Sequence, residues 1–516
     1  MEKKNNAKTK EQGLICALII LLSIMASYYL FLHLISQIHY IKGIHQIRDG
    51  NYGAAVTKLE KAVRHEPKDP LIWKNLGKAY HELGVLKPIK EAFDVSKTAK
   101  YYYLTAAKLN PLDAETAYYL AREEVRLEKL SKYVTYLYHK KENHSYQALP
   151  YFKKAIRLRP NAIGYHYDMA AYLYNQRKED ELLTTIQTLA RIYPPTYYYL
   201  KKEPLWSSPV KEAFKTGLEQ AIKEDISTKD AHKTISYLLS EEKEWSGAIS
   251  HYKQALRYKA NHNSSEDFMH LGNLYVKNRQ FEEARSCFFR SLDLSQTKEK
   301  DLERLYYNYK KEGYSEELYL FYQNAKNRFT LSTTMDILMA RSLIDLNRYH
   351  QAQQILVDVN QKEPTAEAYY WLARIAKIEK DWGRMELAIQ KATVLDPSNS
   401  QYHLVFSQVL RRLTKLDRAE KQAGLAIKHR AKRSAWLFDH RAWIRWDKQD
   451  YPGALKDWKS AITLKPGRAS FYTHAAEACI QIGDWPHAID YYQKAINLDP
   501  ENKDYQKRYL EIKAQS

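Results

Sequence analysis

Residues 484–500 read DWPHAIDYYQKAINLDP, and their order of small, aromatic and proline residues recurs along the chain. The fixed positions are Trp485, Ala488, Tyr492, Ala495 and Pro500. A small residue lets a neighbouring helix approach closely, and an aromatic residue fills the gap beside it. A proline ends the helix because it cannot continue the i→i−4 hydrogen bonds. The segment therefore predicts a helix that packs against its neighbours and stops at Pro500.

The same offsets occur three more times in the last third of the chain. The matching sets are Tyr451, Ala454, Trp458, Ala461 and Pro466; Trp382, Met385, Ile389, Ala392 and Pro397; and Tyr349, Ala352, Leu356, Val359 and Pro364. The four prolines are 33, 69 and 34 residues apart, and the middle interval is two repeats. A period near 34 residues is typical of helix–turn–helix repeats.

Two earlier segments contain the first helix of such a unit. Residues 71–84, LIWKNLGKAYHELG, and residues 268–288, FMHLGNLYVKNRQFEEARSCF, resemble the tetratricopeptide repeat. The matching residues are Trp73, Leu76, Gly77, Tyr80 and Gly84 in the first segment, and Leu271, Gly272, Tyr275, Phe281, Ala284 and Phe288 in the second. The resemblance implies an all-α fold, a right-handed tetratricopeptide-type α–α superhelical solenoid. It also implies that protein partners bind on the concave face.

The repeat offsets predict the domain organisation. We expect about thirteen repeat-length units over residues 36–502. Extra residues predict insertions near 85–98 and 131–147, and the units at 195–228 and 299–332 are degenerate. The polar, amphipathic residues 503–516 predict a helix that caps the solenoid.

The N-terminus contains a long apolar run. Residues 14–35 read LICALIILLSIMASYYLFLHLI and include no Asp, Glu, Lys or Arg. About 20 such residues span a bilayer as a helix, whereas the apolar core of a cleaved signal peptide, the alternative, has roughly 7–15. We therefore expect a retained transmembrane helix over 14–35. No Pro or Gly follows it before Gly43, which predicts one continuous helix from about residue 13 to 48.

Lysines around the apolar run predict its orientation. Lys3, Lys4, Lys8 and Lys10 precede the run, and within a similar distance only Lys42 and Arg48 follow it. The positive-inside rule then makes residues 1–13 a cytoplasmic basic tail. The chain is expected to be a single-pass protein of the inner (cytoplasmic) membrane, with its solenoid in the periplasm or outside.

No motif predicts catalysis. His81-Glu82 begins like a zinc-protease motif but lacks the second His, and the sequence has neither a phosphate-binding loop nor a nucleophile elbow. The cysteines Cys16, Cys287 and Cys479 form no C-x-x-C pair. We expect no enzyme activity, no metal site and no cofactor. The net charge of +20 permits an anionic partner, but no motif indicates nucleic acid.

In the last repeats, the outward positions of the first helix of each unit predict a binding face that is basic and rich in aromatic residues. They are Arg341, Tyr370, Arg374, Lys377, Arg411, Arg412, Trp436, Trp443 and Trp446. Arginine pairs with oxyanions, and tryptophan stacks on cations and sugar rings. Such a face suits an acidic peptide, an anionic glycan or a phosphate-bearing ligand. The alternative is that Trp443 and Trp446 belong to the core between repeats and that the arginines are merely solvated.

Several functions fit these features. The first is a membrane-anchored protein-interaction scaffold in a bacterial envelope, in surface-polysaccharide synthesis or export. The alternatives are a membrane-anchored receptor or co-chaperone for client proteins, and an accessory subunit of a glycosyltransferase or O-antigen ligase complex. Chaperone-docking repeats bind a terminal carboxylate with a Lys/Asn/Arg clamp. Here Asn273 occupies one clamp position, but Met269 replaces the Lys and Lys78 replaces an Asn.

Overall fold

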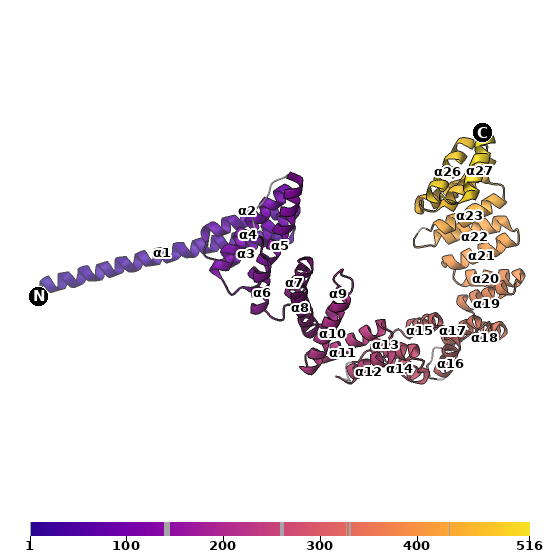
Figure 1. The fold of residues 1–516 in the computed structure, drawn as a ribbon, viewed down its shortest axis with the longest axis horizontal. Coiled ribbons are helices and arrows are strands. Elements are labelled where there is room, and N and C mark those ends of the chain that lie inside the picture. Colours follow the sequence, from indigo (N-terminus) through magenta and orange to yellow (C-terminus); the bar gives the residue numbers. More distant parts are fainter. Residues whose placement is uncertain are drawn as a thin grey trace. The chain divides into compact units, whose positions relative to one another are not determined.

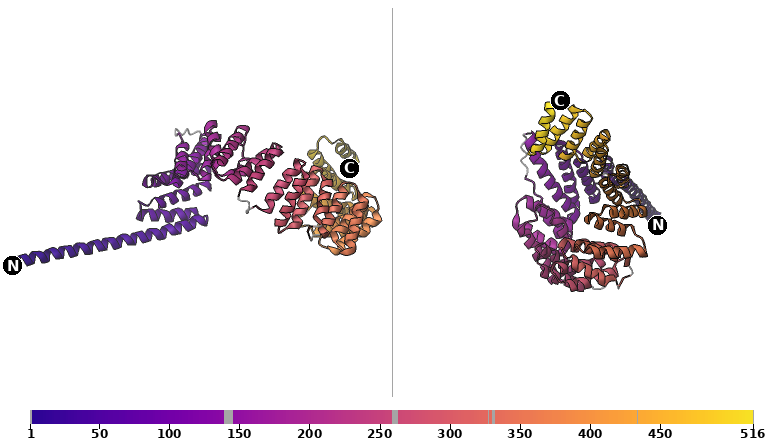
Figure 2. Two further views of the ribbon diagram at one scale, coloured as in Figure 1. Left: turned by 90° about the horizontal axis from the view of Figure 1, so that it is seen from below. Right: turned by 90° about the vertical axis from the view of Figure 1, so that its right-hand side faces the viewer.

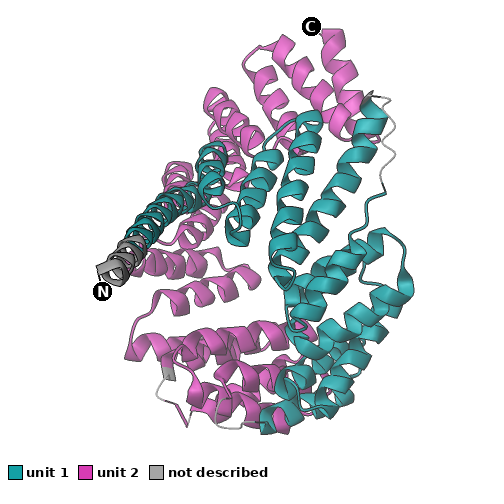
Figure 3. Cartoon of the chain, turned by 90° about the vertical axis from the view of Figure 1, so that its left-hand side faces the viewer, with its two compact units in different colours: residues 1–262 teal, residues 263–516 magenta. Residues whose placement is uncertain are grey.

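The computed structural model describes residues 2–138, 145–258, 263–326, 328–329, 332–432 and 434–515. Over these residues the chain forms 27 α-helices and one short 3-10 helix, with no strand (Figure 1). It divides into two compact units, Met1–His262 and Asn263–Ser516 (Figure 3). The predicted all-α fold class is confirmed.

The helices of the first unit range from a single turn to 47 residues. They are α1 (Glu2–Arg48), α2 (Tyr52–His65), α3 (Pro70–Val85), α4 (Ile89–Leu109), α5 (Ala114–Tyr138), α6 (Leu149–Leu158), α7 (Ile163–Asn175), α8 (Glu179–Ile192), the 3-10 helix (Pro194–Thr196), α9 (Tyr197–Leu200), α10 (Ser208–Lys223), α11 (Thr228–Glu241) and α12 (Trp245–Arg257).

The helices of the second unit are more even in length. They are α13 (Ser265–Lys277), α14 (Phe281–Leu294), α15 (Lys298–Glu312), α16 (Ser315–Lys326), α17 (Ser332–Asp345), α18 (Tyr349–Lys362), α19 (Ala366–Ile378), α20 (Trp382–Leu395), α21 (Ser400–Arg412), α22 (Leu416–Lys428), α23 (Ala435–Asp447), α24 (Tyr451–Leu464), α25 (Ala469–Gln481), α26 (Trp485–Leu498) and α27 (Lys503–Gln515).

Helical hairpins build both units: apart from the short α9 and the last helix α27, each odd-numbered helix packs against the even-numbered helix that follows it. The repeat signature explains how they fit together. In α3, a Cβ added to Gly77 would lie 2.7 Å from a ring atom of Tyr103 in α4. The glycine is therefore needed for the ring to enter. Both Gly77 and Tyr103 are buried. Fully buried alanines belong to the neighbouring core clusters, Ala79 with Leu59 of α2 and Ala99 with Leu120 of α5.

One irregular segment interrupts the hairpins of the first unit. After α8 the chain forms only the 3-10 helix and the four-residue α9, and α10 then packs against α8. Pro194, Pro195, Pro204 and Pro209 lie in or beside this segment, and each removes a backbone donor. Further residues predicted as insertions extend α4 at its start and α5 at its end. Residues 139–144, within the second predicted insertion, lie outside the described part of the chain.

The N-terminal helix α1 runs without a break from Glu2 to Arg48, which confirms the continuous helix predicted through the junction. Its C-terminal part packs against α2, and its N-terminal part extends far beyond that helix (Figures 1 and 2). The apolar side chains from Leu18 to Leu34 are mostly more than half exposed. The rest of the protein buries none of the most apolar stretch of this helix. By length and composition, α1 is a candidate membrane span.

Candidate functional site

The predicted binding face maps onto the first helices α17, α19, α21 and α23. Side-chain contacts connect successive members of this row. Tyr370 of α19 lies 5.2 Å from Tyr402 of α21, ring centroid to ring centroid. Arg411 of α21 donates from Nε to Asp447 of α23, at 2.5 Å. The row therefore forms one continuous side of the second unit, and its residues divide into buried and exposed groups.

Arg341 in α17 is buried, so the expectation that it faces solvent is wrong. Only 4% of the residue is exposed. Its guanidinium lies 4.0 Å from the ring centroid of Tyr306 and 5.0 Å from that of Trp371. Its Nη1 is 3.4 Å from a carboxylate oxygen of Glu367. Aromatic faces and a carboxylate replace the water that the cation loses. Arg341 therefore stabilises the packing of three successive repeats and is not exposed to a ligand.

Trp443 and Trp446 also belong to the core, as the alternative interpretation holds. Both are partly buried and pack against the cluster around Trp458. The ring of Trp443 lies 5.4 Å from that of Trp458 and 4.7 Å from that of His474. Trp458 in turn donates a 2.9 Å hydrogen bond to Asp439. These tryptophans fill the joint between repeats and are not free to stack on a ligand.

The two adjacent arginines of α21 do not form one site with Arg374. Arg411 is half-buried, and its charge is paired with Asp447. Arg412 is exposed but lies over the ring of Trp382 in the second helix α20, 5.4 Å from the centroid. Arg374 lies instead beside Trp371, at 5.7 Å, and donates to the hydroxyl of Tyr370 at 3.2 Å.

Four of the predicted residues remain available on the first helices, and we call them the first-helix strip: Tyr370, Arg374, Lys377 and Trp436. Tyr370 is half-buried, and the side chains of Arg374 and Lys377 are exposed. Trp436 is 49% exposed, and the guanidinium of Arg468 lies 4.0 Å from its ring. The strip offers two cations and two aromatic rings to a partner.

A polar pocket of about 400 Å³ lies at the C-terminal end of the second unit. Its walls come from α25, α26 and the last helix α27, and they include His474, Glu477, Lys507, Arg508 and Glu511. Arg508 donates to Glu477 from Nε, at 2.8 Å, so part of the charge is already paired. The repeat offsets do not predict this pocket, because its lining comes from three helices spread over a full repeat and none of them has a recognisable motif.

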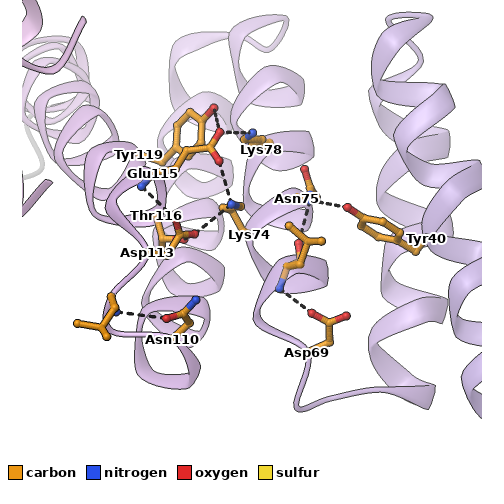
Figure 4. Close-up of polar contacts among 12 residues, drawn as sticks. Tyr40, Asp69, Lys74, Asn75, Lys78, Asn110, Asp113, Glu115, Thr116 and Tyr119 are labelled. Carbon is orange, nitrogen blue, oxygen red and sulfur yellow. Dashed lines mark hydrogen bonds and ion pairs between the residues drawn. The ribbon is translucent and has the colours of Figure 1, made fainter. Parts of the chain in front are cut away.

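The first unit contains an ion-pair network on its first helices that the sequence analysis did not predict (Figure 4). Lys74 of α3 is buried and lies 3.0 Å from Asp113 and 2.9 Å from Glu115. Lys78, one turn later, lies 2.8 Å from Glu115. Burial opposes ionisation of Glu115, but the two lysines outweigh it and lower its pKa to about 2. The sequence feature that could have indicated this network is a pair of lysines four residues apart, followed by carboxylates about one repeat later.

The positions corresponding to a carboxylate clamp are occupied by internal contacts. Met269 is buried, and Asn273 accepts a 3.2 Å hydrogen bond from Asn308. Lys78 is held by Glu115. Capture of a free terminal carboxylate at these residues would require those contacts to break.

His81, the start of the incomplete zinc-protease motif, has a different partner. Its Nδ1 lies 2.5 Å from a carboxylate oxygen of Glu123 in α5. Across the described residues, no group of three or more His, Cys, Asp or Glu side chains is arranged to hold a metal ion. Cys479 is fully buried, and burial raises the pKa of its thiol to about 11.

Comparisons with known families match four parts of the chain. Models described as tetratricopeptide repeat match residues 268–302, 337–400 and 469–502, and a model described as TPR repeat matches residues 48–84. Among curated proteins, a DnaJ homolog subfamily C member 7 homolog from Dictyostelium discoideum is 22% identical over 211 residues. That match covers 37% of this chain and 38% of the relative.

Solved structures of tetratricopeptide proteins also align with the chain. Yeast Tom70 is 16% identical over 93% of this chain and 96% of its own, with a TM-score of 0.33. YrrB, described as a TPR protein with an unusual peptide-binding site, is 15% identical over 36% of this chain and 96% of its own, with a TM-score of 0.34.

Proposed function

We propose that this tetratricopeptide-repeat protein, with its candidate membrane span, is a membrane-anchored and non-catalytic scaffold that holds protein partners on its first helices. Tetratricopeptide repeats bind proteins, which supports the scaffold part. The main support for the anchor is the exposure of the apolar side chains of α1. Leu18, Leu22, Met25 and Phe31 are each 56% exposed or more. A patch of that kind is unfavourable in water, and a bilayer would cover it.

We place the partner on the first-helix strip. Arg374 and Lys377 provide positive charge one turn apart on α19, and Tyr370 and Trp436 provide aromatic surface. An acidic peptide segment fits this combination, since its carboxylates pair with the cations and its apolar side chains pack on the rings. An anionic glycan would use the same groups, with the sugar faces on the rings.

The setting that we propose is a bacterial envelope, with residues 1–13 in the cytoplasm and the solenoid on the other side of the inner membrane. The lysines before the span support this orientation. The pathway would be surface-polysaccharide assembly, in which the chain acts as a scaffold or as an accessory subunit of a glycosyltransferase or O-antigen ligase. A reporter that is active only in the cytoplasm, fused after Ser516, should then be silent.

A second candidate is a membrane-anchored receptor or co-chaperone for client proteins. The similarity to a DnaJ homolog supports it. The occupied clamp positions argue against docking by a terminal carboxylate, so a client would have to bind elsewhere. Co-purification of unfolded client proteins, with no effect on any glycan, would favour this candidate.

Crosslinking and purification from native membranes test the scaffold with a matched pair of variants. Arg374→Ala/Lys377→Ala removes two exposed cations from α19, and Lys421→Ala/Lys428→Ala removes two from the second helix α22. Exposed substitutions change stability by less than about 0.5 kcal/mol each, so both variants should remain folded. We expect only the α19 variant to lose its crosslinked partner. Equal losses in both variants would mean that diffuse charge, and not the strip, attracts the partner.

A further inference from the structure

Contacts between α1 and α2 determine where the first repeat lies along α1 relative to the apolar run. At the far end of the hairpin, a Cβ added to Gly43 would lie 2.7 Å from Leu59. Nearer the run, Ser36 donates a 3.1 Å hydrogen bond to the carbonyl of Ala62. At the end of α2, next to the apolar run, His33 of α1 pairs with Glu66. The hairpin thus returns along α1, and the loop after α2 lies beside His33, at the end of the apolar run.

The loop after α4 lies at the same end of the helices. Tyr40 of α1 accepts a 3.2 Å hydrogen bond from Asn75 near the start of α3. The neighbouring Lys74 binds Asp113, which directly precedes α5. Figure 4 shows Asp69 and Asn110, one from each loop, at the same end of the helices. The two loops therefore form one edge of the first unit.

This edge combines exposed apolar and basic side chains, and we call it the membrane-facing edge. Its apolar members are Leu71, Leu109 and Leu112, which are 43%, 40% and 77% exposed. Its basic members are the exposed Lys68 and Lys108, and among the described residues neither makes an ion pair. At a lipid interface, exposed leucines enter the boundary of the acyl chains while lysines keep their charge among the headgroups, and this edge has both kinds of side chain.

The acidic groups of the edge are already used inside the protein. Glu66 pairs with His33, Asp69 accepts the hydrogen bond that caps α3 from Leu71 N at 2.8 Å, and Asp113 pairs with Lys74. Both loops are held rigidly as well. Trp73 Nε1 donates to the carbonyl of Pro67 at 2.7 Å, and Leu112 N donates to the side chain of Asn110 at 3.2 Å. Lys68 and Lys108 are therefore the charged side chains of the edge that are free to meet an anionic surface.

The length of the apolar run places this edge at the bilayer surface. At about 1.5 Å per residue, residues 14–35 extend about 33 Å, close to the hydrocarbon thickness of about 30 Å. His33 and the adjoining loop then lie where the hydrocarbon ends. Asn75 of α3, which donates to Tyr40, is about two helical turns farther along, within the layer of headgroups.

We propose that the membrane-facing edge contacts the bilayer that α1 spans, with Lys68 and Lys108 on anionic phospholipid headgroups and Leu109 and Leu112 in the headgroup layer. This inference rests on the proposed anchor and deepens it. The contact would hold the first repeat against the membrane and fix the direction in which the solenoid leaves it.

Spin-label depth measurements on the full chain test the proposal. Cys16 and Cys287 are replaced by Ser, and Cys479 is too buried to react. A nitroxide is then placed on Leu112→Cys, on Leu86→Cys or on Ile24→Cys. Leu86 is the matched control, because it is 69% exposed in the connection at the opposite end of the same repeat. Vesicles contain phosphatidylcholine alone or with phosphatidylglycerol.

With phosphatidylglycerol present, we expect the label at 112 to collide preferentially with oxygen, as in a membrane, and the label at 86 to collide preferentially with a water-soluble nickel chelate. Lys68→Gln/Lys108→Gln should reduce the depth at 112 to its value in phosphatidylcholine alone. A label at 112 as aqueous as that at 86, with the label at 24 at bilayer depth, would overturn the edge but leave the anchor. An aqueous label at 24 would instead refute the anchor. Equal depth at 112 in both lipids would refute the role of the lysines.

Discussion

The guanidinium of Arg341 in α17 lies over the ring of Tyr306 in α15, 4.0 Å from the ring centroid. Trp371 of α19 covers another side of the same group, at 5.0 Å. One charged side chain therefore connects three successive first helices. Its position in the repeat is the one from which a surface residue would contact a ligand, yet here it stabilises the solenoid.

Replacing Arg341 should therefore destabilise the second unit locally. Arg341→Ala removes the cation from its aromatic surroundings and leaves a cavity, and we expect a loss of about 2–4 kcal/mol. Hydrogen exchange is the appropriate measurement, because the repeats of a solenoid open locally. Exchange should accelerate in α15, α17 and α19. In the control Arg374→Ala, which removes an exposed arginine from α19, it should change little. Equal effects of the two variants would contradict the structural role of Arg341.

The contrast between Arg341 and Arg374 marks how far the sequence could predict the candidate site. Both arginines occupy outward positions of a first helix, and the repeat offsets treat them alike. Their burial differs because Tyr306 and Trp371 flank Arg341 from neighbouring repeats. The offsets determine which side of a helix a residue occupies, but not what the adjacent repeats place over it. The burial of Trp443 was unpredictable for the same reason, because it results from packing against Trp458 and His474.

The fold itself was predictable because its determinants are local and repeated. Gly272 in α13 would bring an added Cβ within 2.3 Å of a ring atom of Phe288 in α14, as the repeat signature implies. The unpredicted network around Lys74 depends on partners about 40 residues away (|i−j| = 39 for Asp113 and 41 for Glu115). Such pairings between repeats follow from the packing of the helices and have no signature within a single repeat.

Two glycine substitutions should have different effects on stability. Gly272→Ala would force the ring of Phe288 to move, at a cost of about 1–3 kcal/mol that exceeds the gain in helix propensity of about 1 kcal/mol. Exchange in α13 and α14 should therefore accelerate. Gly164 in α7 has no neighbouring atom within 4 Å of an added Cβ. Gly164→Ala should slow exchange in α7 or leave it unchanged. Slower exchange in α13 after Gly272→Ala would show that the ring contact is unimportant.

Acidification should weaken the second unit around His440 in α23. Burial, assisted by the charge of Arg411 and opposed by Asp439, lowers the pKa of His440 to about 4 from 6.5. Because the folded pKa lies below the unfolded one, the stabilisation is complete above pH 6.5 and is lost as the pH falls toward 4. Between about pH 7 and about pH 5 the loss should be about 2 kcal/mol.

Exchange in α21 and α23, compared at the two pH values after correction for intrinsic rates, measures this loss. His440 lies 3.0 Å from the hydroxyl of Ser407 through Nε2, so His440→Gln retains a hydrogen-bonding group without titrating in this range. The variant should lose less stability on acidification than the unmodified chain. The same loss in both proteins would assign the pH dependence to other groups.

The central claim is that α1 anchors the scaffold in a membrane, and flotation of the full chain with vesicles after alkaline carbonate extraction tests it most directly. A matched variant, Ile24→Lys/Met25→Lys, puts two charges at the middle of the apolar run, at a cost of about 2.5–3.5 kcal/mol each. Both side chains are 61% exposed in the protein, so the change should not disturb the repeats. We predict that the unmodified chain floats with the vesicles and that a substantial part of the variant stays in the soluble fraction. Release of the unmodified chain into the soluble fraction would contradict the anchor, and with it the account of the protein as a membrane-bound scaffold.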